Sequence, residues 1–311
     1  MFITETAGKV NYFIKPKFIR KVDNFLFIAY NTAIALPAGV RYMVQESFIH
    51  HHKNVLHYVK AGHGKEPLLV FHGFGQDHTL YVPLLKSLST KYTLYIIDLF
   101  FHGKSEWHGG EEPLKKSTWN SILKVLFTEQ GITSFSILAY SLGGKFALTT
   151  IEGFPKQVKE VYLLAPDGIK TSFWYSLATY PNIFRTFFKS MIFRHERFLM
   201  IANKLNEYNL VDKGLIRFAD YQMNTEAKRK RVYYSWVVFR HLTFDLKKIG
   251  TLINQNNMKL TLIVGKYDKV IKPENMQGLL RFVRDYRLEI IESGHTGMMS
   301  ESLRFLMEEK K

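Results

Sequence analysis

The sequence contains no cysteine. This absence excludes disulfide bonds, thiolate metal ligands and a cysteine nucleophile together, and it fits a reducing compartment. We therefore expect a cytoplasmic protein, while a periplasmic location stays open. Long apolar runs are missing too. The apolar stretch Asn24–Leu36 falls below the roughly 20 residues that a membrane-spanning helix needs, and it begins too far in for an ordinary signal peptide.

Acidic residues are few relative to basic ones. The chain has 27 aspartates and glutamates against 43 lysines and arginines, and its formal net charge is +16. Such an excess favours nucleic acid, anionic lipid or anionic substrates as partners. The sequence carries no helix-turn-helix, zinc-finger or RNA-binding signature, so we expect no nucleic-acid partner. We interpret most of the charge as a basic, solvated surface.

The length and the apolar content bound the architecture. A chain of 311 residues, 46% of them hydrophobic, suffices for one large α/β domain with an insertion or for two small domains. Short apolar stretches rich in β-branched and aromatic residues predict buried strands. They lie at residues 67–71, 92–97, 134–139, 160–164, 259–264 and 287–291, and a further pair, 47–52 and 55–59, predicts a hairpin.

Ser141 stands where a predicted strand changes abruptly into a predicted helix. The strand covers Ser134–Ala139 and the helix covers Lys145–Ile151. A chain that reverses so sharply needs small residues beside the turn, and Gly143 and Gly144 provide them. The arrangement exposes a serine hydroxyl at the N-terminus of a helix. Taken alone, it is also typical of a serine that only caps a helix.

The segment A-Y-S-L-G, residues 139–143, resembles the nucleophile elbow G-x-S-x-G of the α/β-hydrolase fold family, with alanine in place of the first glycine. Residues 72–75, H-G-F-G, follow a predicted strand and resemble the oxyanion loop of the same family. During ester attack negative charge collects on the carbonyl oxygen, which then needs preorganised donors. The resemblance assigns these donors to the backbone N–H groups of Phe74 and Leu142.

Two late segments resemble the remaining parts of the family's catalytic machinery. Gly265–Pro273 resembles the acid loop and contains Asp268, and residues 292–295 resemble the loop that ends in the catalytic histidine, His295. With Ser141 they follow the family's chain order. The resemblance implies Ser141 as the nucleophile, His295 as the general base and acid, and Asp268 as the group that orients the imidazole.

Two further aspartates, Asp167 and Asp98, also follow predicted strands. Asp167 follows the strand at 160–164, a place from which some members of the family supply the acid, so it is an alternative to Asp268; it is also suited to cap the next segment. Asp98 opens D-L-F-F-H-G-K-S, which resembles the family's D-x-P-G-x-G-x-S with Phe100 and Phe101 in place of proline and glycine. We interpret Asp98 as structural.

The implied chemistry requires no metal and no organic cofactor. The histidines His50–His52 do not change this expectation, because neighbouring strand residues point to opposite faces and no carboxylate cluster accompanies them. We interpret these histidines as structural or surface residues.

Four parts are predicted along the chain. They are an N-terminal helical extension over 1–45 with a helix at Asn24–Leu36, a first core part over 46–168, a helical cap over 169–248 and a second core part over 249–311. The core is expected to be a mostly parallel sheet flanked by helices. Its aromatic, helical insertion resembles the cap of capped family members and predicts a largely apolar substrate.

The resemblance implies a serine hydrolase that cleaves a carboxylic ester with an apolar acyl or alcohol group through an acyl-serine intermediate. Serine at position 141 argues against the family branches that need aspartate there. Two alternatives stay open: a carbon-carbon bond hydrolase of a diketone acid, and a non-catalytic, membrane-associated binding protein that keeps the fold. We interpret the apolar N-terminal helix as packed on the main domain or on a partner subunit, and the basic run Lys228–Arg231 as a solvated helix face. The alternative is that both belong to a common surface for peripheral contact with anionic membrane. The oligomeric state is left open.

Overall fold

The computed structural model describes residues 5–6, 9–10, 17–22, 25–35, 41–171, 173–208 and 220–308. One large sheet contains β3 (Phe18–Val22), β4 (Phe25–Ala35), β5 (Arg41–His51), β6 (Asn54–Ala61), β7 (Glu66–Phe71), β8 (Tyr92–Ile97), β9 (Phe135–Tyr140), β10 (Val158–Leu164), β11 (Lys259–Gly265) and β12 (Tyr286–Ile291). Its strand order is β12-β11-β10-β9-β7-β8-β6-β5-β4-β3. Two short strands, β1 (Glu5–Thr6) and β2 (Lys9–Val10), pair separately.

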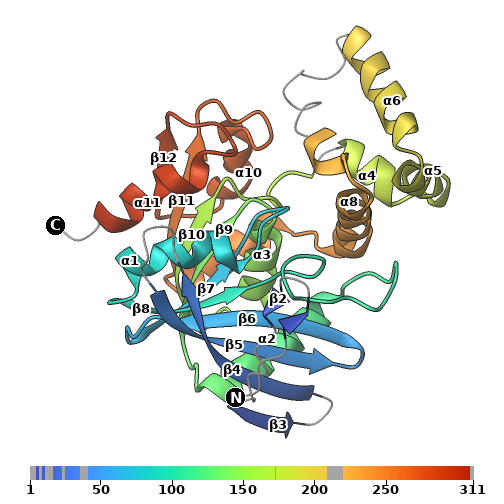
Figure 1. Cartoon of the computed structure of the whole chain (residues 1–311). Coiled ribbons are helices and arrows are strands. Elements are labelled where there is room, and N and C mark those ends of the chain that lie inside the picture. Colours follow the sequence, from blue (N-terminus) through green and yellow to red (C-terminus); the bar gives the residue numbers. More distant parts are fainter. Residues whose placement is uncertain are drawn as a thin grey trace.

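Helices cover both faces of the large sheet, which confirms the predicted α/β class (Figure 1). One face carries α2 (Lys116–Gln130), α3 (Gly143–Gly153), α9 (Leu246–Gln255) and α10 (Gln277–Leu280), the last preceded by the 3₁₀ helix η3 (Pro273–Met276). The other face carries the 3₁₀ helix η1 (His78–Leu84), α1 (Leu85–Leu88) and α11 (Met298–Glu308).

The six strands β8, β7, β9, β10, β11 and β12 lie parallel to one another, and their side chains alternate between two buried clusters. Leu69 and Phe71 of β7 belong to the cluster under α2 and α3, whereas Leu68 and Val70 belong to the cluster under η1 and α11. A strand that is buried on both faces needs apolar residues at every position. This requirement explains why the sequence shows continuous apolar runs here.

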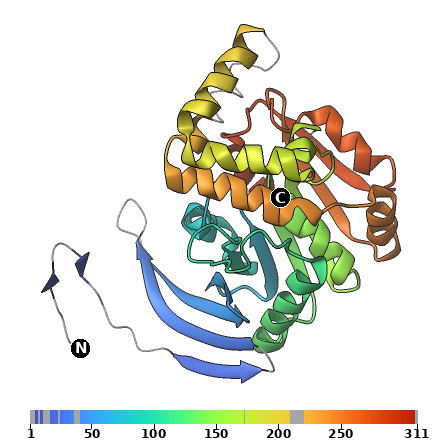
Figure 2. The ribbon, with the colours of Figure 1, turned by 90° about the vertical axis from the view of Figure 1, so that its right-hand side faces the viewer.

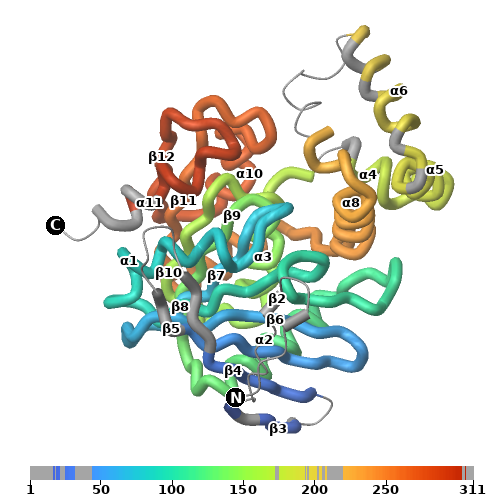
Figure 3. The backbone as a smooth tube through the Cα atoms, viewed as in Figure 1, coloured from blue at the N-terminus to red at the C-terminus, as the bar shows by residue number. Residues whose placement is uncertain are grey.

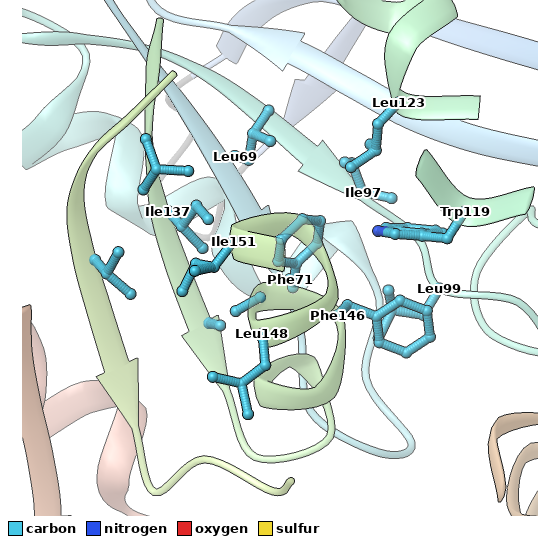
Figure 4. Packing of buried hydrophobic residues seen from close by; sticks show 14 of the residues in the cluster. Leu69, Phe71, Ile97, Leu99, Trp119, Leu123, Ile137, Phe146, Leu148 and Ile151 are labelled. Carbon is cyan, nitrogen blue, oxygen red and sulfur yellow. The ribbon is translucent and has the colours of Figure 1, made fainter. Parts of the chain in front are cut away.

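An aromatic group fixes α2 and α3 on the sheet (Figure 4). The ring of Trp119 lies 4.7 Å from the ring of Phe146 and 5.8 Å from that of Phe71, measured between centroids. The Trp119 Nε1 atom donates to Thr150 Oγ1 at 3.2 Å, so its only polar group is satisfied although the residue is fully buried. These contacts fix α3 on the sheet, directly after the turn from which it begins.

The helix predicted over Asn24–Leu36 was wrong within the described residues, because Phe25–Ala35 form the strand β4. Eleven residues of β4 pair antiparallel with β5. Phe27 and Ala29 are fully buried while Leu26, Ile28 and Tyr30 are only partly so, which is the two-residue period of a strand. The predicted boundary at 45/46 falls inside β5, so these strands continue the sheet as an antiparallel meander through β6 to β8.

Helices also fill the described part of the insertion between β10 and α9, as the sequence predicts. They are α4 (Phe173–Thr179), α5 (Asn182–Phe193), α6 (His195–Glu207), α8 (Glu226–Val238) and the 3₁₀ helix η2 (Phe239–His241). We call residues 169–248 the helical insertion. Its own core joins α5 to α8 through Phe188, Ile192, Val232, Tyr233 and Val237. The tube drawing shows this body at one end of the sheet domain (Figure 3), and the rotated view shows the same grouping (Figure 2).

Candidate active site

Ser141 lies on the sharp turn that joins β9 to α3. Its φ angle is +49°, a left-handed conformation that few residues other than glycine adopt. Backbone hydrogen bonds hold the turn: Ser141 N–H donates to Leu164 at 2.9 Å, and its carbonyl accepts from Asp167 at 2.8 Å and from Gly144 at 2.9 Å. A strained turn held from both sides is the geometry expected of a nucleophile elbow.

The small residues around this turn are required by close packing. A Cβ atom added to Gly143 would overlap the carbonyl oxygen of Phe71, and one added to Gly144 would lie 2.5 Å from the carbonyl oxygen of Asp167. Ala139 pairs in register with Phe71 of β7 on one side and with β10 on the other, and it is fully buried. Alanine in place of the family's first glycine is therefore accommodated inside the sheet.

The three residues that the sequence singles out as a triad come together at one edge of the sheet. The Oγ atom of Ser141 lies 2.9 Å from Nε2 of His295, and Nδ1 of His295 lies 2.6 Å from Oδ2 of Asp268. The Asp268 carboxylate cannot donate, so Nδ1 carries the proton and Nε2 is free to accept the serine hydroxyl proton. The contact between Ser141 and His295 joins residues 154 positions apart, and the contact between His295 and Asp268 joins residues 27 positions apart.

Residues outside the triad hold both Asp268 and His295 in place. The second oxygen of Asp268 accepts the backbone N–H groups of Val270 and Ile271, each at 2.8 Å, and the residue is buried. The hydroxyl of Tyr140 donates to the carbonyl of His295 at 2.6 Å. The carboxylate and the imidazole are therefore preorganised for one orientation.

Asp167, the alternative acid, makes different contacts. Its Oδ1 atom accepts the N–H of Gly168 at 2.7 Å, and its Oδ2 atom lies 3.8 Å from Nζ of the buried Lys145. That Lys145 amine also lies over the ring of Tyr175, 4.7 Å from its centroid. The structure thus brings Asp268 to His295 and turns Asp167 toward the helical insertion.

The loop after β7 has the form expected of an oxyanion loop. Nε2 of His72 accepts Leu99 N–H at 2.9 Å, so its Nδ1 donates to the Gly73 carbonyl at 2.7 Å. Burial lowers the pKa of His72, in agreement with this neutral form. Within the part of the chain that the structure describes, the N–H groups of Phe74 and Leu142 donate to no other protein atom, so both are available to a ligand.

The helical insertion contacts the loops beside Ser141. Phe74 packs against the apolar core of the insertion, and Tyr234 of α8 stacks on Phe101 with ring centroids 5.9 Å apart. Phe101 has φ +70°, the left-handed conformation for which the family pattern uses glycine. Stacking on Tyr234 and contact with Phe239 hold the phenylalanine in this strained position.

Asp98 is structural, as its sequence pattern predicts. It is fully buried and accepts Nδ1 of His57 at 2.8 Å, the backbone N–H of His78 at 2.8 Å and that of Lys104 at 3.0 Å. Nδ1 of His78 lies within 3.0 Å of the same carboxylate. These hydrogen bonds lower the pKa of Asp98 against the effect of burial.

No sequence pattern indicated the two histidines around Asp98. His57 and His78 precede Asp98 by 41 and 20 positions, and no local motif connects the three residues. Among the described residues they form a buried group whose ligand atoms lie within 4.8 Å of one another. The carboxylate satisfies both imidazole N–H groups by direct hydrogen bonds, so this geometry is that of a hydrogen-bonded network.

The sequence pattern of the alpha/beta hydrolase fold family matches residues 66–302. The chain belongs to this family. A (lyso)-N-acylphosphatidylethanolamine lipase of Bos taurus is 33% identical over 113 residues, 33% of this chain and 31% of the lipase. A pimeloyl-[acyl-carrier protein] methyl ester esterase of Legionella pneumophila is 29% identical over 44% of this chain and 52% of the esterase. The chain thus spans about a third of the length of the lipases that it matches.

Solved structures agree on the fold. Naproxen esterase from Bacillus subtilis superposes with a TM-score of 0.59 at 17% identity, covering 86% of this chain and 90% of the esterase. A thermophilic esterase from Thermogutta terrifontis gives a TM-score of 0.60 at 16% identity, covering 90% and 97%. At this level of identity the likeness concerns the fold, and function has to be argued from the site.

Proposed function

We propose that the protein is a serine hydrolase that cleaves carboxylic esters with an apolar acyl or alcohol group. The hydrogen-bonded relay from Ser141 through His295 to Asp268 carries this proposal. Such a relay activates a hydroxyl for attack on a carbonyl carbon. The relatives named as a methyl ester esterase and as lipases support a hydrolytic role.

The mechanism follows from the groups in the site. His295 takes the proton of Ser141 as its oxygen attacks the ester carbonyl, and Asp268 stabilises the resulting imidazolium. The N–H groups of Phe74 and Leu142 bind the oxyanion. Collapse of this intermediate breaks the bond to the alcohol, which takes the proton from His295, and leaves an acyl-serine. His295 then activates water, which releases the acid and regenerates Ser141.

An apolar substrate is supported by the contacts above the site. The oxyanion loop presents Phe74 to the helical insertion, and the loop after β8 presents Phe101 to Tyr234. Aromatic side chains of this kind favour apolar ligand groups over charged ones. We therefore expect an acyl or alcohol chain rather than a charged group next to the reacting carbonyl.

The test is hydrolysis of p-nitrophenyl esters of increasing acyl length by wild type, Ser141→Ala and the control Ser121→Ala. Ser121 is an exposed serine on α2, away from the elbow. Hydrolysis by wild type and Ser121→Ala, with loss of activity and of fluorophosphonate labelling in Ser141→Ala, is the expected result.

Two other outcomes separate the alternatives. Labelling of Ser141 without turnover of any ester would favour carbon-carbon bond hydrolysis, which the release of acid from a diketone acid would reveal. A folded wild type that is neither labelled nor active would contradict the hydrolase proposal and favour a binding role.

A further inference from the structure

The outer side of α5 exposes large apolar residues. Ile183 is 76% exposed, and Phe184 and Phe187 are each nearly half exposed. Residues at these spacings lie on one face of a helix. The adjoining face of α5 packs on α8 through Phe188 and Ile192, both buried. The apolar surface of α5 is therefore wider than the part that packs inside the chain.

The next helix exposes apolar residues as well. Leu199 and Met200 of α6 are exposed, Met200 by 55%. In both ribbon views α6 projects beyond the body of the sheet domain (Figures 1 and 2). Several large, exposed apolar residues on two successive helices mark a binding surface rather than ordinary variation of a protein surface.

Basic residues surround these apolar side chains. Among the described residues, Arg194, Arg197 and Lys204 pair with no carboxylate, whereas Arg185 and Lys189 on the inner side both reach Glu111. Glu196 and Glu207 are the acidic residues of α6. The whole insertion has fifteen lysines and arginines against six aspartates and glutamates, a net charge of +9 out of the chain's +16.

We propose that this surface docks on an anionic lipid bilayer. The α5–α6 surface is defined by Ile183, Phe184, Phe187, Arg194, Arg197, Leu199, Met200 and Lys204. Exposed apolar side chains that enter the boundary of the acyl chains, with unpaired cations beside them for lipid phosphates, are the combination by which amphipathic helices bind membranes. The positive charge selects an anionic bilayer over a zwitterionic one.

The proposed contact is peripheral. Within the described ranges, no helix combines the length and the apolar character that crossing a bilayer requires. The stretch Asn24–Leu36, which the sequence suggested as a second membrane element, does not take part as a helix because Phe25–Ala35 belong to the sheet. The insertion thus has one side toward the loop of Phe74 and another toward the lipid.

The test measures binding rather than turnover, so it is independent of the proposed hydrolysis. Full-length Ser141→Ala protein is floated with vesicles of phosphatidylcholine alone or with 30% phosphatidylglycerol, in ~0.05 M and ~0.5 M salt, conditions in which charge screening differs strongly. We expect binding to the anionic vesicles at low salt, and at least about tenfold weaker binding to neutral vesicles or at high salt.

Two variants of this protein assign the contact to the α5–α6 surface. The charge variant combines Arg194→Glu, Arg197→Glu and Lys204→Glu, and its control makes the same change of net charge elsewhere with Lys86→Glu, Lys124→Glu and Lys159→Glu. The apolar variant combines Ile183→Ser, Phe184→Ser and Phe187→Ser, and its control is Ile290→Ser, an equally exposed apolar position on β12. We expect each variant to lose at least about tenfold in affinity for anionic vesicles. The fold-loss in affinity of each control should be less than half as large.

Four outcomes would overturn the proposal. They are absence of vesicle binding, equal binding to neutral and anionic vesicles, equal loss in the charge variant and its control, and equal loss in the apolar variant and its control. Sedimentation without vesicles checks the competing occupant: a dimer that dissociates in the apolar variant would show that a second copy covers this surface instead. Circular dichroism confirms that the variants fold.

Discussion

His295 reaches Asp268 at 2.6 Å, while the other oxygen of that carboxylate is held by two backbone N–H groups. This fixed pairing predicts different results for the two candidate acids. Asp268→Asn should lower kcat by about 10³- to 10⁴-fold, because an amide at this position no longer holds the productive imidazole tautomer. Asp167→Asn should change kcat by less than about tenfold, because its contacts are with Gly168 and Lys145.

Ester turnover by both variants at saturating substrate checks this prediction. The order of the two effects is decisive: a larger loss in Asp167→Asn would make Asp167 the working acid. Both replacements preserve side-chain shape, and urea unfolding of each variant separates loss of catalysis from loss of folding.

Gly73 lies directly before one proposed oxyanion donor and against an aromatic ring. A Cβ atom at this position would lie 2.7 Å from the ring of Tyr140, so either the loop or the ring must move. Tyr140 in turn donates to the carbonyl of His295. We expect Gly73→Ala to lower kcat by about 10²-fold, the loss typical of one displaced oxyanion donor, with a smaller effect on KM.

The matched control for this change is Gly110→Ala. Gly110 has φ +59°, so alanine adds backbone strain there, but nothing lies within 4 Å of the new Cβ atom. Steady-state kinetics of the two variants should differ accordingly. If Gly110→Ala lost as much kcat as Gly73→Ala, general destabilisation would account for both effects.

The parts of the fold that the sequence predicted are those with local signals. The strands around the elbow are continuous apolar runs because both of their faces are buried, and Ser141 is marked by small residues that close packing requires. Phe101 was marked as well, since it replaces glycine in a known pattern and indeed has a positive φ.

The parts that the sequence did not predict depend on distant partners. The apolar stretch of β4 has the length and composition of either a helix or a strand, and its pairing with β5 decides for the strand. In the same way, His57 becomes an internal ion-pair partner only because three separate segments bring Glu46, His78 and Asp98 around it. No spacing along the chain reports such a contact.

His57 links the meander to the parallel half of the sheet through charge. Its Nδ1 atom bonds Oδ2 of Asp98, its Nε2 atom lies 3.8 Å from Glu46, and Glu46 also pairs with Lys104. Nδ1 of His78 lies 3.0 Å from the same Asp98 oxygen. Burial lowers the pKa of His57, but the two carboxylates outweigh it and the net pKa is raised. The pKa of Glu46 is lowered to about 2.

A raised histidine pKa stabilises the folded state while the histidine is charged. The contribution of His57 should be fully present below its unfolded-state pKa of about 6.5 and should be lost as pH rises through its higher folded-state pKa. Urea unfolding between pH 5 and 9 should therefore show a difference in free energy between wild type and His57→Gln that shrinks as pH rises above about 6.5. A difference independent of pH would refute charge on His57, and an NMR titration of its ring provides a second check on wild type.

Phe101 combines backbone strain with aromatic packing, and magnitudes decide which effect dominates. Replacement by glycine removes the cost of the left-handed conformation, about 1–2 kcal/mol. It also destabilises the folded state by about 0.5–1 kcal/mol, because glycine loses more chain entropy on folding. It also removes ring contacts with Tyr234 and Phe239, worth about 0.5–1.5 kcal/mol each besides the apolar burial. We expect Phe101→Gly to destabilise the protein by about 1–3 kcal/mol in urea unfolding. Phe101→Asn, which tolerates the same backbone conformation without a large ring, should lose a similar amount. If Phe101→Gly were as stable as wild type, stacking on Tyr234 would not be what holds the strained loop, and the insertion would have to be fixed through Phe74 instead.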